Sequence, residues 1–211
     1  AALLACAASQ ALAQSGSGVE SVVVTGSRVI SDTANSPTPV TIVSTEQLAA
    51  TSPTNIPDGL NKLPVFFGSQ TIGKAGDGTK NAASNILDLR HFGSQRTLIL
   101  FDGHRAPPSN ADGTVDIDSL PQMLVQRVDV VTGGASAVYG SDAVTGVVNF
   151  VLDRNFTGLK TDFNAGLSNY GDAMSYKMAV AAGSELFGGR GHVEGSVEYR
   201  PMDGYDFFSR P

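Results

Sequence analysis

The segment Val125–Leu152 constrains the fold of this chain more than any other part of the sequence. Its sequence is VQRVDVVTGGASAVYGSDAVTGVVNFVL. In an extended chain Val128 and Val130 face one way, and Arg127, Asp129 and Val131 face the other. This period-2 alternation predicts a strand with one buried face. Gly133 and Gly134 follow, and glycine enters the positive-φ region without steric cost. The strand is therefore expected to end at a glycine corner.

The second half of the segment predicts a helical turn and another strand. Ala135–Tyr139 is long enough for a single helical turn, and Gly140 closes it as a glycine at a helix C-terminus does. Gly146 then begins an apolar run that only Asn149 interrupts. Nothing in the segment is a nucleophile, a metal cluster or a phosphate-binding loop, so we interpret it as scaffold.

These residues carry a resemblance to a known family. The pattern is similar to I-E-R-V-E-V-L-R-G-P-A-S-A-L-Y-G followed by G-A-x-G-G-V-I-N-I, which is typical of the plug domain of TonB-dependent outer-membrane receptors. Gln126 stands where the family usually has Glu, and Thr132-Gly133-Gly134 replaces Arg-Gly-Pro. The resemblance implies a structural corner made of Arg127, Gly133, Gly134, Tyr139, Gly140 and Asn149. It also implies that the contacts of the plug with a surrounding barrel include Arg90, Arg127 and Asp129.

Composition agrees with a turn-rich β protein that does not bind nucleic acid. The chain has 211 residues, 24 of them glycine, and a formal net charge of −6. A high glycine content favours turns between strands, and an acidic chain is a poor match for a polyanion. Its apolar runs are shorter than the roughly 18 residues of a membrane-spanning helix. We expect an α+β fold in which a small mixed sheet with short helices, the plug domain, spans residues 37–155.

The N-terminal residues resemble the end of a secretory signal. Residues 1–15 are small and apolar, and Ala11-Leu12-Ala13 fits a small-x-small cleavage site. A lipoprotein cleavage box, with Cys6 as the acylated residue, is the alternative. Cys6 is the single cysteine of the chain. We therefore expect a mature protein without disulfides, held by packing and hydrogen bonds.

Residues 16–36 combine a flexible Gly/Ser lead with a β-prone run. The run is Val22, Val23, Val24, Thr25 and Gly26. It would form either an edge strand of the core or a strand that a partner can add to its own sheet. It is similar to the family's TonB box, E-x-V-V-V-T-G-S-R, and the resemblance implies that the periplasmic TonB energy transducer binds there.

The plug region predicts several short elements. Ser44–Gln47 is a capping box at the start of a helix, with Ser at the cap and Gln three residues later. Asn55–Leu63 predicts a second helix because Ile56, Leu60 and Leu63 share one face. The remaining elements are predicted strands at Val40–Val43, Asn85–Arg90 and Gln95–Phe101, the last of them central, and a short helix at Ser119–Leu124.

Two loops of the plug region are candidates for contact with a substrate. Phe66–Ser84 is a long polar loop, and His104–Ser119 contains a calcium-loop-like pattern around Gly113. If Gly113 took the sixth position, Pro108 and Ser119 would take the first and twelfth, so both end carboxylates are missing and we reject calcium. The resemblance implies apical, substrate-facing loops instead. The candidate residues are Asn81, His104, Arg105, Asn110 and Asp112.

The last part of the chain alternates apolar and polar residues. The alternation covers Leu159–Leu167, Tyr176–Ala182 and Val193–Tyr199, with turn residues between them. Strands with one apolar and one polar face are typical of a barrel wall in a membrane. Three strands cannot close a barrel, so we expect residues 156–211 to be the first, incomplete part of an outer-membrane β-barrel in a larger receptor.

The resemblance implies a function in transport. We expect energy-coupled uptake of a scarce nutrient, such as a siderophore, another metal chelate, cobalamin or an oligosaccharide, across the outer membrane of a Gram-negative bacterium. The expected partners are the TonB transducer, a small extracellular substrate and membrane lipid. We find no catalytic motif, cofactor site or metal cluster in the sequence. A free-standing, plug-like interaction module without transport activity is the alternative.

Overall fold

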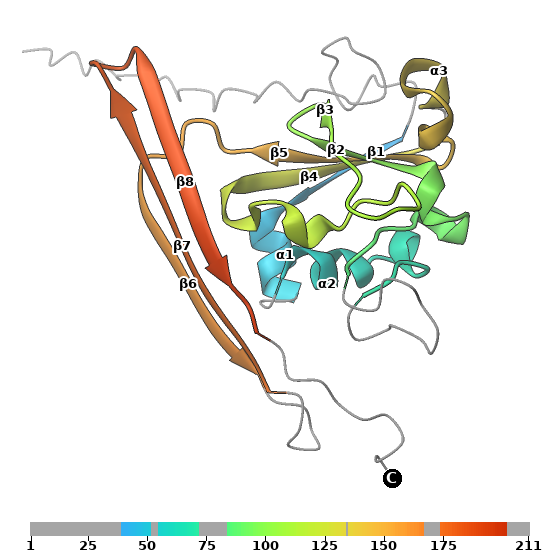
Figure 1. Cartoon of the computed structure of the whole chain (residues 1–211), viewed down its shortest axis with the longest axis horizontal. Helices are drawn as coiled ribbons and strands as arrows, with labels where there is room; N and C mark the ends of the chain where they lie inside the picture. The colour runs from blue at the N-terminus through green and yellow to red at the C-terminus, as the bar shows by residue number, and fades with distance from the viewer. Residues whose placement is uncertain (1–38, 52–54, 72–83, 134, 167–173, 202–211) are drawn as a thin grey trace, which may run out of the picture.

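A mixed sheet with short helices forms the larger part of the molecule, and a second sheet stands beside it (Figure 1). The structure is a computed structural model that describes residues 39–51, 55–71, 84–133, 135–166 and 174–201. The first sheet has five strands in the order β1-β4-β5-β2-β3, and the second has three in the order β6-β7-β8. The α+β fold class is confirmed. No helix within these residues is long and apolar enough to span a membrane.

The elements have the following bounds. The strands are β1 (Val40–Ser44), β2 (Thr97–Phe101), β3 (His104–Arg105), β4 (Val125–Thr132), β5 (Gly146–Leu152), β6 (Gly158–Gly166), β7 (Ser175–Leu186) and β8 (Gly191–Tyr199). The α-helices are α1 (Thr45–Thr51), α2 (Ile56–Asn61) and α3 (Ser136–Tyr139). The 3₁₀ turns are η2 (Pro64–Phe66), η4 (Leu89–His91), η5 (Ser94–Arg96), η6 (Ile117–Ser119), η7 (Gln122–Leu124) and η8 (Ser141–Ala143). We call residues 39–156 the core domain and β6–β8 the side sheet.

The predicted strand–corner–strand segment lies at the centre of the first sheet. β4 and β5 pair antiparallel as far as Thr132 opposite Gly146, and β5 also pairs parallel with β2. The corner between them follows the prediction: Gly133 has φ +86°, α3 is a single turn, and Gly140 has φ +91°. β1 pairs with the free side of β4. The segment therefore supplies the two strands on which the other strands assemble.

The prediction that β4 has one buried face was wrong, because both of its faces are buried. Val128 and Val130 pack on the side of α1 and α2, in the larger hydrophobic cluster. Val131 packs on the other side, with Ala135 and Ala143 of the corner. Asp129, which points to the same side as Val131, is also fully buried.

The first two helices form near their predicted positions: α1 begins at the predicted capping box, and α2 covers Ile56–Asn61 of the predicted Asn55–Leu63. Ser44 and Gln47 make the reciprocal capping box: the Ser44 N–H donates to Gln47 Oε1 over 3.2 Å, and the Gln47 N–H donates to Ser44 Oγ over 3.3 Å. Asn55 caps α2 by accepting the Asp58 N–H at 2.7 Å. Each cap satisfies N–H groups that have no partner within the helix.

The strand predicted at Asn85–Arg90 is wrong. Ile86 makes only an isolated bridge with Gln70, and the backbone N–H groups that follow donate to side chains instead of a neighbouring strand. The Asp88 N–H donates to Ser69 Oγ and the Leu89 N–H to Thr97 Oγ1, over 2.9 and 3.0 Å. Arg90 and His91 both have φ +58°, which turns the chain into η4.

Two further predictions need smaller corrections. The strand predicted at Gln95–Phe101 begins only at Thr97, and it lies inside the sheet between β5 and the two-residue β3. The helix predicted at Ser119–Leu124 is instead the two 3₁₀ turns η6 and η7. They are separated at Leu120-Pro121, where the missing N–H of proline prevents a continuous helix.

Gly146 has the strictest steric requirement of the glycines in the central segment. Its φ is +145°, and a Cβ at this position would lie 2.1 Å from the carbonyl oxygen of Val131 in the neighbouring strand. We expect Gly146→Ala to lower the free energy of unfolding by about 2–5 kcal/mol, through backbone strain and overpacking. Gly133→Ala is the matched control, since φ is also positive there but no atom lies within 4 Å of the added Cβ. It should cost only roughly 1–2 kcal/mol.

Urea unfolding of the 211-residue chain in a mild detergent would measure both changes. Equal midpoints for the two variants would contradict a steric requirement at Gly146.

Candidate functional site: the interface between the core domain and the side sheet

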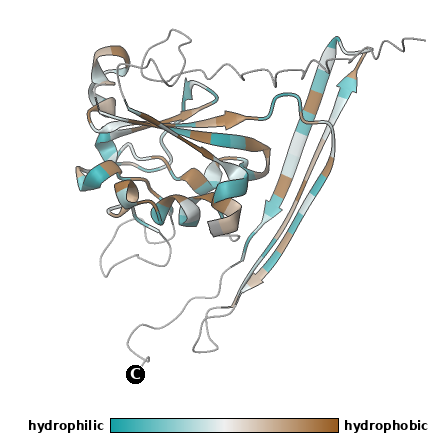
Figure 2. Ribbon diagram, turned by 180° about the vertical axis from the view of Figure 1, so that it is seen from behind, coloured by the Kyte–Doolittle hydropathy of each residue, from teal (hydrophilic) through white to brown (hydrophobic). Residues whose placement is uncertain are grey.

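The side sheet has two unlike faces. In the register of β6, β7 and β8, Phe163 lies opposite Met178, and Met178 lies opposite Tyr199, so these side chains share one face. This face points away from the core domain, and Figure 2 shows the alternation of apolar and polar residues along the strands. Its exposed large apolar residues are Leu159, Phe163, Met178, Val180, Val193, Val197 and Tyr199. The three predicted strands and their alternation are confirmed within the described residues; Leu167, the last residue of the first predicted strand, lies outside them.

The opposite face of the side sheet contacts the core domain through small and polar residues. Ala179 and Ala181 of β7 are buried against Met123 and Leu124 of η7, with Phe156 packed beside them. Small side chains on the strand allow η7 to approach the sheet closely. The side sheet is therefore packed on the core domain at this point, and its apolar outer face has no cover among the described residues.

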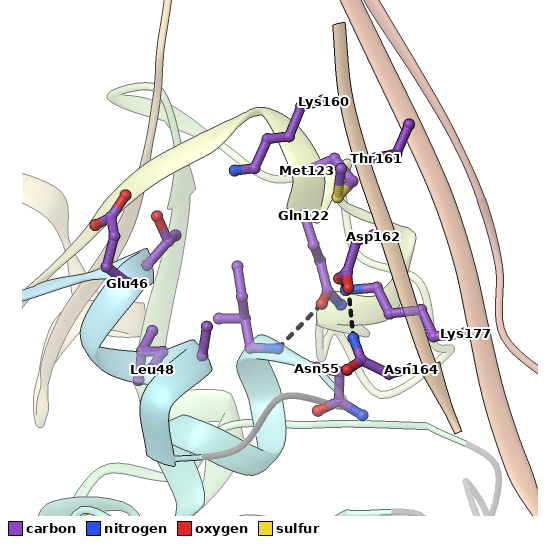
Figure 3. Close-up of a pocket in the computed structure, with 13 residues that line it drawn as sticks. Glu46, Leu48, Asn55, Gln122, Met123, Lys160, Thr161, Asp162, Asn164 and Lys177 are labelled. Atoms are coloured by element: carbon purple, nitrogen blue, oxygen red, sulfur yellow. Dashed lines mark hydrogen bonds and ion pairs between the residues drawn. The ribbon is translucent and has the colours of Figure 1, made fainter. Parts of the chain in front are cut away.

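A cavity of about 430 Å³ separates the two parts next to this contact (Figure 3). Its walls are α1, α2 and η7 on one side and β6 and β7 on the other. Lys177 is buried in the wall and pairs with Asp162, with Nζ and Oδ2 2.8 Å apart. Glu46 of α1 and Lys160 of β6 line the cavity from opposite parts. The cavity thus combines charged residues with apolar ones such as Leu48 and Ile56, whereas the side-chain contact at η7 is apolar.

Two direct polar contacts join the core domain to β8 and the residue after it. The Met123 N–H donates to Glu198 Oε1 over 2.8 Å. Arg200 pairs with Asp118, with Nη2 and Oδ1 2.8 Å apart. Sequence reasoning missed these residues. The alternation of the predicted strand places Glu198 and Arg200 on its polar face, but the sequence does not indicate which groups they meet.

Two of the three residues predicted to contact a barrel pair with each other in the described structure. The Arg127 Nε–H donates to Asp129 Oδ1 over 3.1 Å, so these two residues pair with each other along β4. Arg90 is exposed in η4. The contacts with the side sheet come from η6 and η7 instead. A role for Arg90, Arg127 and Asp129 against other parts of a barrel stays a prediction.

The corner residues hold the central segment together. The side chain of Asn149 accepts the Gly103 N–H at 2.9 Å, which fixes the turn between β2 and β3 against β5. Tyr139 packs against the smaller hydrophobic cluster, and its carbonyl oxygen accepts a hydrogen bond from Arg105. Gly134, predicted as part of the corner, lies outside the described residues, as do Asn81 and the run from Val22 to Gly26.

The remaining candidates for substrate contact make hydrogen bonds within the core domain. Asn110 Nδ2 donates to Thr114 Oγ1, and Asp112 Oδ1 accepts from both the N–H and the hydroxyl of Thr114. Arg105 pairs with Asp142 at 2.6 Å. The ring of His104 contacts the Asp102 carbonyl oxygen at 3.1 Å.

The structure brings two of these candidates together at a second cavity. This cavity has a volume of about 610 Å³, and both Arg105 and Asp112 line it. His104 and Asn110 are not among its lining residues. In the part of the chain that the structure describes, no three His, Cys, Asp or Glu residues are placed to hold a metal ion.

Asp129 is the most deeply buried carboxylate of the described residues that shows a shifted pKa. Burial raises the pKa of Asp129, and the charge and hydrogen bond of Arg127 oppose that shift. Its second oxygen, Oδ2, has no hydrogen-bond partner. Burial is also the largest cause of the raised pKa of Asp58 and of Asp88.

Comparison with known proteins identifies the same domain. Residues 32–147, more than half of the chain, match the family model of the TonB-dependent Receptor Plug Domain. Three solved structures are similar. A mutant of the ferric enterobactin receptor (PfeA) from Pseudomonas aeruginosa is 22% identical with a TM-score of 0.59, over 84% of this chain and 26% of that one. The siderophore receptor PirA from Acinetobacter baumannii is 19% identical with a TM-score of 0.60, over 79% of this chain and 25% of that one.

The third is the ferripyoverdine receptor of the outer membrane of Pseudomonas aeruginosa. It is 16% identical with a TM-score of 0.58, over 85% of this chain and 22% of that one. The chain thus spans about a quarter of the length of the structures that it matches. At these identities the likeness shows the fold.

The buried carboxylate of Asp129 predicts a pH dependence of stability. Because its pKa is raised in the folded chain, the folded state binds more protons than the unfolded state between the unfolded and the folded pKa. The free energy of unfolding therefore rises as pH falls from neutral through the folded pKa. Asp129→Asn removes this contribution. When the pH is lowered from 7 to about 4, near the ordinary pKa of Asp, we therefore expect the urea midpoint of the variant to increase less than that of the wild type.

Glu46→Gln, at an exposed residue in the first turn of α1, is the control for that measurement. An unchanged pH dependence in Asp129→Asn would contradict the assignment.

Proposed function

The chain belongs to the TonB-dependent receptor plug-domain family, and from this we propose that it forms the plug and first wall strands of a receptor for energy-coupled nutrient uptake across the outer membrane. The family consists of non-enzymatic transporters. One observation carries the proposal further than the family match. The side sheet turns small and polar residues toward the core domain and large apolar residues away from it.

This two-faced sheet fits a barrel wall. In transmembrane barrels apolar side chains face lipid and alternate along each strand with side chains that face the lumen. We assign the exposed face that contains Phe163, Val180 and Val197 to lipid. The face that contains Lys177 and Ala179 is the lumen side, on which the core domain sits. Residues 37–155 are the plug and residues 156–211 the first part of the wall in this proposal.

The resemblance and the similar structures guide the choice of substrate. One of the similar structures is described as the ferric enterobactin receptor in complex with enterobactin. A ferric siderophore is therefore the first class to test for this chain, before other metal chelates, cobalamin and oligosaccharides. The substrate-facing loop in this proposal contains Arg105, Asn110 and Asp112, and Arg105 and Asp112 line the second cavity.

The alternative, a plug-like interaction module without transport, requires the side sheet to stand in water. Leu159, Phe163 and Val197 are each more than two-thirds exposed on one continuous face. Large exposed apolar patches mark interaction sites or lead to aggregation, and open sheet edges add to that tendency. Contact with lipid explains this face without a further partner, so we favour the receptor.

The lipid assignment predicts which residues of β6 contact the membrane. A spin label at Phe163→Cys, in the receptor reconstituted in lipid vesicles with Cys6 replaced by Ser, should collide frequently with oxygen and rarely with a water-soluble nickel chelate. Oxygen partitions into the acyl chains, whereas the chelate does not. Lys160→Cys is the matched control, because it lies on the same strand but lines the inner cavity. Equal accessibilities at the two positions would exclude the wall assignment.

The proposed TonB box predicts a separation of binding from uptake. Val23 lies outside the described residues, and its role rests on the resemblance. Val23→Pro removes a backbone donor that an added strand would use. Whole cells should then still bind a ferric siderophore but lose its energy-dependent uptake. Val23→Ala keeps the N–H group and should retain uptake. Normal uptake by the proline variant would remove the box assignment.

A further inference from the structure

We propose that Asp118 is a positioning residue that couples the loop before it, residues 105–116, to both helix α2 and wall strand β8. The coupling deepens the proposed function. It rests on that function for the identity of the loop as substrate-facing and of β8 as part of the wall. The hydrogen bonds that carry it are present in the described structure and do not depend on the substrate.

Three segments meet at the carboxylate of Asp118. Oδ1 accepts from Arg200 Nη2 at 2.8 Å and from Gln122 Nε2 at 3.2 Å. Oδ2 accepts from the side-chain amide of Asn85. The side chains of Asp118 and Arg200 are only 19% and 20% exposed. A charge-assisted hydrogen bond is stronger where water is largely excluded, so this junction is more than a surface ion pair.

A continuous series of hydrogen bonds leads from Asp118 into the loop. The Asp118 N–H donates to Asp116 Oδ1 over 3.1 Å, and the Asp116 N–H donates to Ser109 Oγ over 3.2 Å. The Ser109 N–H donates to the Thr114 carbonyl oxygen. The Thr114 N–H in turn donates to Asp112 Oδ1. A displacement of the loop at Asp112 therefore changes the geometry at Asp118.

A second series leads from Asp118 to α2. The side-chain amide of Gln122 donates from its nitrogen to Asp118, and its oxygen, Oε1, accepts the Ile56 N–H at 3.1 Å. Ile56 is the first residue of α2, and it is buried. Because one planar amide makes both contacts, movement of Asp118 shifts the acceptor that satisfies the N-terminus of α2.

The third connection reaches the wall. Arg200 is the residue directly after β8. Met123, the residue after Gln122, donates its N–H to Glu198 within β8. The end of β8 thus contacts η6 through Asp118 and η7 through Met123, and these two residues are five positions apart. Loss of the Arg200 charge leaves a partly buried carboxylate without its charged donor, which lowers the stability of this folded junction relative to its open state.

Amide hydrogen exchange of the full 211-residue chain in detergent, without substrate, tests the coupling. Arg200→Gln and Asp118→Asn should each speed exchange of the Ile56 N–H at least about tenfold, since charge-assisted bonds of this kind are worth about 1.5–3 kcal/mol. Arg154→Gln is the matched control. It removes an arginine that pairs with Asp102 at another site of the core domain, and it should leave Ile56 unchanged.

The pKa of Asp58 gives a second readout that a purely structural role would not move in this way. Burial raises that pKa most, the Asp118 charge raises it further, and the Arg200 charge lowers it. Arg200→Gln should therefore raise the Asp58 pKa, and Asp118→Asn should lower it, in an NMR titration of the carboxyl carbon. Opposite shifts together with faster Ile56 exchange support the coupling.

Unchanged Ile56 exchange in both variants, or equal effects of the Arg154→Gln control, would overturn it. Neither measurement involves uptake, so a failure of the Val23→Pro test would count against the proposed function and leave this result standing.

Discussion

The pairing of β4 with β5 is the interaction on which the rest of the structure depends. The other strands of the first sheet build outward from this pair: β1 joins the free side of β4, β2 joins the free side of β5, and β3 joins β2. The pair also divides the core, since Val130 and Val148 lie in one hydrophobic cluster and Val131 and Val147 in the other. The close approach of Gly146 to the carbonyl oxygen of Val131 sets how the two strands meet at the corner.

The same pair positions the interface with the side sheet. β4 begins directly after η7, and β5 leads through Asp153 into β6, whose partner β7 packs on η7. The Asp153 N–H donates to the Leu124 carbonyl oxygen over 2.9 Å, which holds the exit of β5 against the entry of β4. The strands of the side sheet therefore start from a fixed point, and their inner face meets the core domain at the turns that precede β4.

Much of the fold could be predicted from local sequence signals. The capping box at Ser44, the glycine corner at Gly133 and the alternation from Leu159 onward each depend on neighbouring residues, and each is present in the structure. The strand predicted at Asn85–Arg90 failed because the side chains of Ser69 and Thr97, which lie outside that segment, accept the N–H groups of Asp88 and Leu89. The candidate site was less predictable. Its main contacts join Asp118 to Arg200 and Met123 to Glu198 across at least 75 positions, and no local pattern encodes such a pairing.

The cavity beside η7 has a mechanical consequence. On its side of the interface, Glu46 and Lys160 face a space that already lies between α1 and β6, so moving these elements further apart exposes little new surface. At η7 the same separation would expose Met123 and Leu124, which Ala179 and Ala181 now cover. Apolar exposure costs about 25 cal/mol per Å², so the resistance to opening is concentrated at one edge. The relative motion of the core domain and the side sheet that meets the least resistance is therefore a rotation about an axis at η7.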